Sequence, residues 1–153
     1  MNKKLAIFGV LILGLVVLSG CSQNSSSSDK SGSQASTESL KPKAEKIEVI
    51  NFHATQRCVS CSTLGDYSEA TIYEFFQPEL RDGVISFQSI NVDLPENREI
   101  ATKYQAAGSS LFINVIYDGQ DHIEEDVRVW RLLNSEQQFK SYLKNKINGL
   151  LNK

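Results

Sequence analysis

Two cysteines, Cys58 and Cys61, stand between a run of apolar residues and a segment with helical periodicity. The run "KIEVINF" (46–52) carries apolar side chains on both of its faces, which predicts a strand buried on both sides. The segment after the cysteines repeats large apolar residues at helical spacing as far as Phe76, and Pro78 is expected to close this helix. A strand, a CxxC pair and a helix in direct succession therefore constrain the fold more than any other feature.

The middle of the chain continues the alternation of strand and helix patterns. Residues 84–92 form a second β-rich run, and Pro95 stands where the first turn of a short helix is expected. This helix is predicted to run through Tyr104 and to be ended by Gly108. The apolar residues 111–117 then predict a third strand.

The last part of the chain predicts a hairpin and a final helix. Asp118 and Gly119 are a strong tight-turn signal between two strands. Three apolar residues alternate beyond the turn and extend the predicted second strand of the hairpin: Ile123, Val127 and Val129. Residues 124–126 are expected to form a solvated acidic face. Ser135 and Gln138 form a capping box for a helix with one apolar stripe: Phe139, Leu143, Ile147 and Leu150.

The predicted element order is β-α-β-α-β-β-α, within one domain over residues 46–153. Two crossovers followed by a hairpin give a four-stranded mixed sheet with helices on both faces, so the predicted class is α/β. The chain shows no internal repeat.

The N-terminal residues 1–20 are typical of a secretory signal. Lysines precede an apolar run of 14 residues from Leu5 to Leu18, which is short for a membrane-spanning helix. The run ends in "LSGC", which resembles a bacterial lipobox. The resemblance implies cleavage after Gly20, attachment of diacylglycerol to Cys21, and anchoring outside the cytoplasm to the cell membrane or outer membrane. The alternative is an ordinary signal peptide with a stray cysteine.

A polar tether is predicted between the lipid and the domain, over residues 21–45. Nine serines fall within residues 22–46, and large apolar side chains are almost absent, so this segment cannot offset its chain entropy by burial. Without the two lysines of the signal, 14 basic and 18 acidic residues remain, for a net charge of −4. A mildly acidic chain without a dense basic run gives no reason to expect nucleic-acid binding.

Once Cys21 is lipidated, the remaining cysteines form an even pair in an exported chain, where a disulfide can form. Thiol–disulfide exchange needs an accessible thiolate to attack and a nearby thiol to resolve the mixed disulfide. At the start of a helix, unpaired N–H groups favour a negatively charged Cys58, and the adjacent Arg57 favours it further. We therefore predict that Cys58 is a nucleophile with a lowered pKa and that Cys61 is the resolving thiol.

The sequence alone leaves other hypotheses for the role of the two cysteines open. A structural disulfide is one, although so small a loop removes little entropy from the unfolded chain. Zinc needs four ligands, and only His53 and His122 are available to supplement the two sulfurs, with His122 expected to be distant. His53 either tunes the cysteines and shuttles a proton or simply packs at the end of its strand. A cluster shared between two copies, and a non-catalytic module that binds a partner, are further alternatives.

This element order, with a CxxC between the first strand and the first helix, resembles the thioredoxin fold. Three stretches carry the resemblance: "FHATQRCVSC" (52–61), "INVDLPENREIATKYQAAG" (90–108) and "IYDGQ" (116–120). The first is similar to small exported thioredoxin-like proteins with an RCxxC motif. The resemblance covers residues 46–151. It implies a thiol–disulfide oxidoreductase without an organic cofactor, which acts on protein thiols or disulfides and exchanges electrons with a separate redox partner.

Three departures from the family pattern are visible. Arg-Cys-Val-Ser-Cys (57–61) replaces the usual Trp-Cys-Gly-Pro-Cys core. The buried acidic residue of the family's first strand is absent, and Asn51 or Phe52 occupies that region. The cis-proline that faces the cysteines in the family falls at Ser110. Because a cis bond without proline costs about 3 kcal/mol, the Ser109–Ser110 bond is expected to be trans and its loop to differ in shape.

Overall fold

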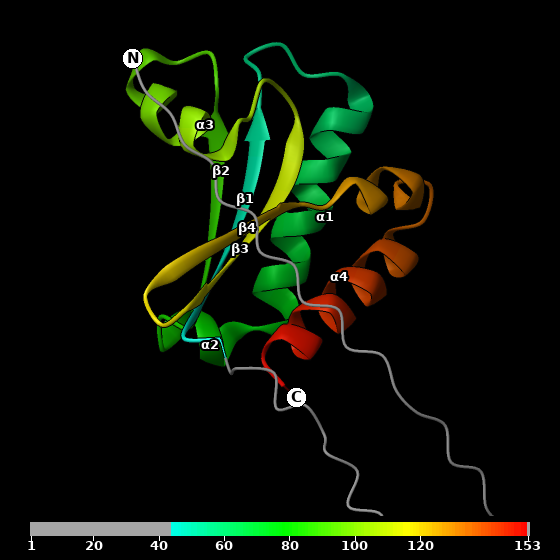
Figure 1. Cartoon of the computed structure of the whole chain (residues 1–153). Coiled ribbons are helices and arrows are strands. Elements are labelled where there is room, and N and C mark those ends of the chain that lie inside the picture. The colour runs from blue at the N-terminus through cyan, green and yellow to red at the C-terminus, as the bar shows by residue number, and fades with distance from the viewer. Residues whose placement is uncertain (1–43, 153) are drawn as a thin grey trace, which may run out of the picture. The chain divides into compact units, whose positions relative to one another are not determined.

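The computed structural model describes residues 44–152, which form a four-stranded mixed sheet flanked by helices (Figure 1). The strands are β1 (Lys46–His53), β2 (Ile85–Asn91), β3 (Ser110–Tyr117) and β4 (Gln120–Glu125), in the order β2-β1-β3-β4. β1 is parallel to β2 and antiparallel to β3, and β3 is antiparallel to β4. The predicted fold class is confirmed.

The predictions for the signal, the lipobox and the tether lie outside the described residues. Within residues 44–152, no helix combines the length and the apolar character needed to cross a membrane.

Helices cover both faces of the sheet, and β1 contributes to the core on each side. α1 (Val59–Phe75) and α4 (Glu136–Leu150) pack against each other on one face, and α3 (Arg98–Tyr104) lies on the other. Ile47 and Val49 join the large cluster beneath α1 and α4. Ile50 and Phe52 join the smaller cluster that contains Tyr104. The alternation of apolar residues along β1 thus sets the two-sided core that its sequence predicts.

The register brings three element ends to one edge of the sheet. His53, the last residue of β1, pairs with Asn91 at the end of β2, and the neighbouring Phe52 pairs with Ser110 at the start of β3. The N–H of Val92 extends this edge by donating to the carbonyl of His53 at 2.8 Å. The loop with the two cysteines leaves the sheet here, so residues 91–93 and the start of β3 are its neighbours.

A polar cluster ties α3 to the face of the sheet. Tyr104 donates from its hydroxyl to Glu48 at 3.1 Å, and Asn114 donates to the same carboxylate oxygen at 3.1 Å. Burial by itself raises the pKa of Glu48, but hydrogen bonds from Lys46 and Asn114 outweigh it and hold that pKa below its usual value. Burial and the nearby carboxylate raise the pKa of Tyr104. The hydroxyl therefore stays a donor that attaches α3.

The first and third helices end close to where the sequence predicts, at Phe75 and Tyr104, but the residues predicted to close them are not their caps. Pro78 does not close the first helix; it stands in the first turn of a separate short helix, α2 (Gln77–Arg81), because a proline there has no N–H to satisfy. Gly108 does not end the third helix. Gln105 does so with a left-handed φ of 53°, and its N–H bonds to the carbonyl of Thr102 at 3.1 Å. The one-turn 3₁₀ segment η1 (Pro95–Asn97) precedes α3.

The second strand of the hairpin is shorter than predicted. The turn itself is confirmed, since Asp118 and Gly119 have φ values of 49° and 69°. However, β4 ends at Glu125, and a 3₁₀ helix, η2 (Val127–Leu132), follows. Asp126 starts this helix because its carboxylate accepts the N–H of Arg128 at 3.2 Å.

Asp126 is buried, so the prediction of a solvated acidic face is wrong at this residue, although Glu124 and Glu125 are exposed. The hydroxyl of Tyr142 donates to the Asp126 carboxylate at 3.0 Å, and Lys146 pairs with that carboxylate at 3.1 Å. A buried carboxylate is expected to have hydrogen-bonding and charged partners of this kind, because burying it without them is costly.

Ser135 caps α4 as predicted, by accepting the N–H of Gln138 at 3.4 Å. The N–H of Ser135 donates to the carbonyl of Leu132, so the reciprocal half of a capping box is not formed. The predicted apolar stripe of α4 faces the core: Phe139, Leu143 and Ile147 are buried, and Leu150 is half-buried.

Candidate active site

Cys58 and Cys61 form a disulfide at the start of α1, with their Cα atoms 5.0 Å apart. Cys58 is the N-cap residue, and its sulfur accepts the N–H of Cys61 at 3.1 Å. Cys58 is exposed, whereas Cys61, one turn inside, is half-buried. The first sulfur is thus the one that an outside molecule reaches, and the second is the one that the fold shields.

The helix start offers the sulfur of Cys58 an environment that suits negative charge. The first N–H groups of a helix have no partners within the helix, and the helix dipole adds partial positive charge there. No acidic residue stands in the first turn of α1, so no carboxylate of that turn competes with the sulfur. The position predicted from the sequence, at or just before the helix, is where the structure places Cys58.

Arg57 and His53, which precede Cys58 in the chain, contact each other. The Arg57 guanidinium lies within hydrogen-bonding distance of His53 Nε2, and His53 Nδ1 lies 3.0 Å from the carbonyl oxygen of Ala54. A guanidinium can only donate, so Nε2 accepts and Nδ1 carries the proton that it donates to Ala54. His53 is buried. Among the described residues, Arg57 makes no hydrogen bond to either sulfur.

The loop between β1 and α1 is held by two residues whose role the sequence does not indicate. The N–H of Thr55 donates to the carboxylate of Asp93 at 2.7 Å, and Asn91 donates to the Thr55 hydroxyl at 3.0 Å. Asn91 also accepts the N–H of Asp93 at 3.0 Å. Both residues lie 36 to 38 positions away from Thr55, so only the paired ends of β1 and β2 bring them to this loop.

Asn51, rather than Phe52, lies between β1 and α1. Its side chain is fully buried, and its Nδ2 donates to the hydroxyl of Ser89 at 3.2 Å, while its Oδ1 has no hydrogen-bond partner. A Cβ atom added to Gly65 of α1 would lie 2.8 Å from Asn51 Nδ2. Gly65 is one helical turn beyond Cys61, so α1 approaches β1 closely below the redox pair only because this residue has no side chain.

Replacing Gly65 with alanine is expected to lower the free energy of unfolding by about 1 kcal/mol. Overpacking a core costs about 1–3 kcal/mol, and the better helix propensity of alanine offsets about 1 kcal/mol of that cost. In an Asn51→Ala background the clash is gone, so the same substitution should raise the free energy of unfolding. Urea unfolding of the four proteins measures both effects. A stabilising Gly65→Ala in both backgrounds would show that α1 does not press on Asn51.

Ser110 lies at the same edge of the sheet as the disulfide loop. It is buried as the first residue of β3, pairs with Phe52 of β1, and donates from its hydroxyl to the carbonyl of Gly108 at 3.3 Å. The trans form of the Ser109–Ser110 bond stays a prediction.

His122 lies at the opposite end of the sheet, as expected. Its ring contacts that of Tyr117 beside the hairpin turn, with the centroids 5.3 Å apart. Within residues 44–152, no group of three or more histidine, cysteine, aspartate or glutamate side chains is placed to hold a metal ion. The structure therefore brings Arg57 and His53 into contact with each other in the segment that leads to Cys58, and it places His122 beside the hairpin turn instead.

Comparisons with known proteins give similar solved structures only. No family model matches the sequence, and no curated protein matches it. The Trx4 domain of ERdj5 is 14% identical, with a TM-score of 0.45 over 69% of this chain and 83% of that chain. Thioredoxin from Fasciola hepatica is 23% identical, with a TM-score of 0.41 over 67% and 82% of the two chains. Human ERp44 is 15% identical, with a TM-score of 0.45 over 76% of this chain and 30% of its own.

The fold is identified by the chain's own topology. A sheet with the order β2-β1-β3-β4, with a disulfide-bonded CxxC between β1 and the helix that follows it, is a thioredoxin-like fold.

Proposed function

We propose that this protein is a thiol–disulfide oxidoreductase that works outside the cytoplasm while anchored to a bacterial membrane. One observation carries the catalytic part of the proposal. The exposed Cys58 caps the N-terminus of α1, and the half-buried Cys61 is close enough to form a disulfide with it. An accessible sulfur beside a shielded one is the arrangement that thiol–disulfide exchange requires.

The reduced pair would act in two steps. The Cys58 thiolate attacks one sulfur of a client disulfide; a Cys58–client bond forms, the client disulfide breaks, and one client sulfur leaves as a thiolate. Cys61 then loses its proton to solvent and attacks the sulfur of Cys58, which releases the second client thiolate. The client gains two electrons and its thiolates take up protons, while Cys58 and Cys61 become a disulfide. The reverse sequence oxidises a client dithiol, and the redox partner that resets the pair sets the direction.

Arg57 and His53 are proposed to tune this chemistry. The guanidinium keeps its positive charge at every physiological pH and is adjacent in sequence to Cys58, so it favours the thiolate over the thiol. Its contact with the buried His53 restricts where that charge lies. His53 is then a positioning residue that acts through Arg57.

The location is proposed from the sequence alone. The apolar run that ends in "LSGC" supports lipidation of Cys21, and the serine-rich residues 21–45 would separate the lipid from the domain. When cells that express the protein are fed a labelled fatty acid, the protein should carry the label and fractionate with the membrane. The Cys21→Ser variant should carry no label and should not be found in the membrane fraction. A label that is retained by Cys21→Ser would refute this anchor.

The reduction potential of the Cys58–Cys61 couple tests the proposed function. Catalytic carriers have potentials between about −270 and −120 mV, whereas structural disulfides usually lie below about −300 mV. We expect a value in the first range, measured by equilibrating the protein with glutathione buffers and separating the two forms. A value below about −300 mV would favour the rival function, in which a thioredoxin-like module binds a partner and its disulfide is inert.

A further inference from the structure

Exposed apolar side chains gather at the disulfide end of the sheet. Four large apolar residues of the described chain are strongly exposed, and three of them lie here: Val59 is 85% exposed, Val127 64% and Leu94 40%. Val59 follows Cys58 directly, Leu94 follows the loop anchor Asp93, and Val127 opens η2 just beyond β4. Apolar side chains exposed at the end of the sheet that carries the disulfide are available to contact other molecules.

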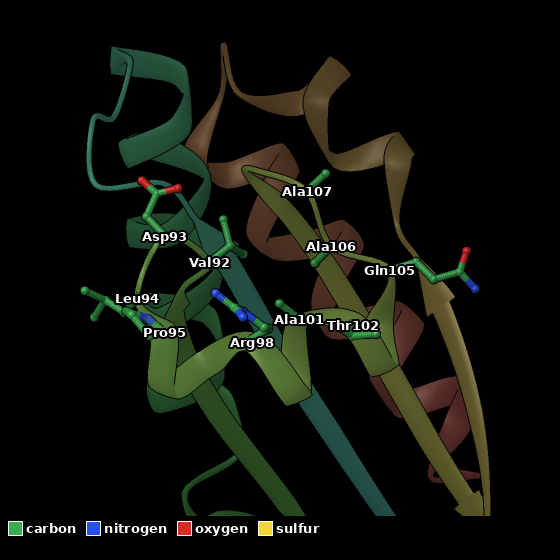
Figure 2. A pocket seen from close by; sticks show the side chains of 10 residues that line it. All are labelled: Val92, Asp93, Leu94, Pro95, Arg98, Ala101, Thr102, Gln105, Ala106 and Ala107. Atoms are coloured by element: carbon green, nitrogen blue, oxygen red, sulfur yellow. The ribbon is translucent and has the colours of Figure 1, made fainter.

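One side of this surface is a pocket of about 390 Å³ between α3 and the loop that follows β2, here called the Arg98 pocket (Figure 2). Asp93 and Arg98 are its only charged lining residues, and Leu94 and Ala101 are among the apolar ones. Asp93 also holds Thr55 of the disulfide loop, so the pocket adjoins that loop. In Figure 2, Arg98 extends from α3 toward the loop that bears Asp93.

Arg98 has no anionic partner within residues 44–152. Its side chain makes no hydrogen bond or ion pair with another described residue, although Asp93 lines the same pocket. A carboxylate oxygen of Asp93 is engaged by the N–H of Thr55 instead. The pocket therefore presents a guanidinium whose bidentate donors are available for an incoming carboxylate.

A second pocket, of about 660 Å³, lies at η2 and is here called the Arg131 pocket. Its lining residues are Val127, Arg128, Arg131 and Leu132, with no carboxylate among them. Side chains three apart in a 3₁₀ helix project in the same direction, so the two arginines point to one side. Arg128 stacks over the ring of Tyr142 at 5.1 Å, whereas Arg131 makes no ion pair with a described residue.

The Arg131 pocket belongs to the same end of the fold as the disulfide. The N–H of Asp126, just before η2, donates to the carbonyl of Leu111 at 2.8 Å. Leu111 follows Ser110, and Ser110 pairs with Phe52 of β1. β1 ends one residue later, at His53, and the disulfide loop begins there. The nearby carboxylate of Asp126 is already neutralised by Lys146. Glu96 and Glu125 are exposed at this end but line neither pocket.

We propose that the protein selects client segments in which acidic and apolar residues flank the reacting cysteine. The guanidinium groups of Arg98 and Arg131, which form no ion pair with a described residue, receive the client carboxylates, and the exposed aliphatic side chains at this end of the sheet cover the client's apolar residues. This inference rests on the proposed function and names its class of substrate. The attraction is local, because the net charge of the chain is negative and by itself disfavours an acidic client.

Three disulfide-linked synthetic peptides provide the test. Each has a cysteine beside a leucine, with flanking residues that are glutamate, glutamine or lysine. The reduced, full-length protein should reduce the glutamate peptide about tenfold faster than the lysine peptide at low salt, and the difference should shrink at about 1 M salt. Arg98→Glu and Arg131→Glu should each lower the preference by about threefold, since an exposed pair contributes up to about 1 kcal/mol. The double variant should show almost no preference between the two peptides.

Arg81→Glu is the matched control. Arg81 is an exposed arginine in α2, outside both pockets, and the substitution changes the net charge by the same amount. It should leave the preference unchanged; a loss equal to that of Arg98→Glu would mean a general charge effect and would overturn the inference. Equal rates for the three peptides would also overturn it while leaving the proposed function intact. If no peptide is reduced, glutamine peptide included, the proposed function fails and the inference fails with it.

Discussion

Replacing Cys61 with serine should leave Cys58 joined to client proteins as mixed disulfides that persist on a non-reducing gel. In the wild-type protein, Cys61 is one helical turn from Cys58 and close enough to form a disulfide with it, so it is expected to resolve the intermediate rapidly. Serine cannot attack a disulfide in this way, and release then depends on an outside thiol. Trapped complexes should be abundant in Cys61→Ser and scarce in the wild type, and turnover should fall to the rate without protein.

Cys58→Ser is the control for this trapping. It keeps the half-buried Cys61 but removes the exposed sulfur, so it should neither trap clients nor turn over. Equal trapping by the two variants would mean that the sulfurs do not have distinct roles. If Cys61→Ser forms no complexes, the exchange mechanism would be wrong, and a partner-binding module with an inert disulfide would be the better account.

Phe52→Ala should have the largest effect on stability, with a loss of about 3–5 kcal/mol in the free energy of unfolding. Phe52 is fully buried, and its ring lies 5.4 Å from that of Tyr104 and 5.6 Å from that of Phe112. Its truncation leaves a cavity between the sheet and α3, at the end of β1 that leads to the disulfide. Denaturant unfolding followed by circular dichroism measures the loss.

Tyr73→Ala serves as the comparison for Phe52→Ala. Tyr73 is 48% exposed on α1 and has a single ring contact, with Phe87 at 6.4 Å, so its loss should cost about 1 kcal/mol or less. If the two variants are equally stable, the smaller cluster does not support the end of β1. The disulfide loop would then depend mainly on Asp93 and Asn91.

Local patterns predicted the fold because they depend on neighbours in sequence. The alternation along β1, the Asp118–Gly119 turn and the stripe of α4 each follow from a period or a backbone preference, and each is confirmed. The end of the hairpin was wrong for the opposite reason. Val127 and Val129 alternate like strand residues, but Asp126 turns the chain into η2 with help from Tyr142, which lies 16 residues away. No local pattern encodes that contact.

At the candidate site, too, the features set by local sequence were predictable and those set by long-range contacts were not. The spacing of Cys58 and Cys61 and their place after a strand were sufficient to predict the pair and its position at the start of a helix. The supports of the loop were not predictable, because Asp93 meets Thr55 only through the pairing of β1 with β2. The sequence also left open whether Asn51 or Phe52 occupies the region where the thioredoxin family has a buried acidic residue. The two side chains leave β1 on opposite faces of the sheet: Asn51 points toward Gly65 of α1, and Phe52 joins the cluster that contains Tyr104.

The central claim is that Cys58 carries a stabilised thiolate at the N-terminus of α1, and alkylation of the reduced protein at a series of pH values tests it most directly. Mass spectrometry of the two cysteine-bearing fragments follows each rate separately. We expect the rate at Cys58 to titrate with a pKa clearly below the value of about 8.5 for a free thiol, and the rate at Cys61 not to do so. If both thiols titrate together near about 8.5, Cys58 is not the activated nucleophile.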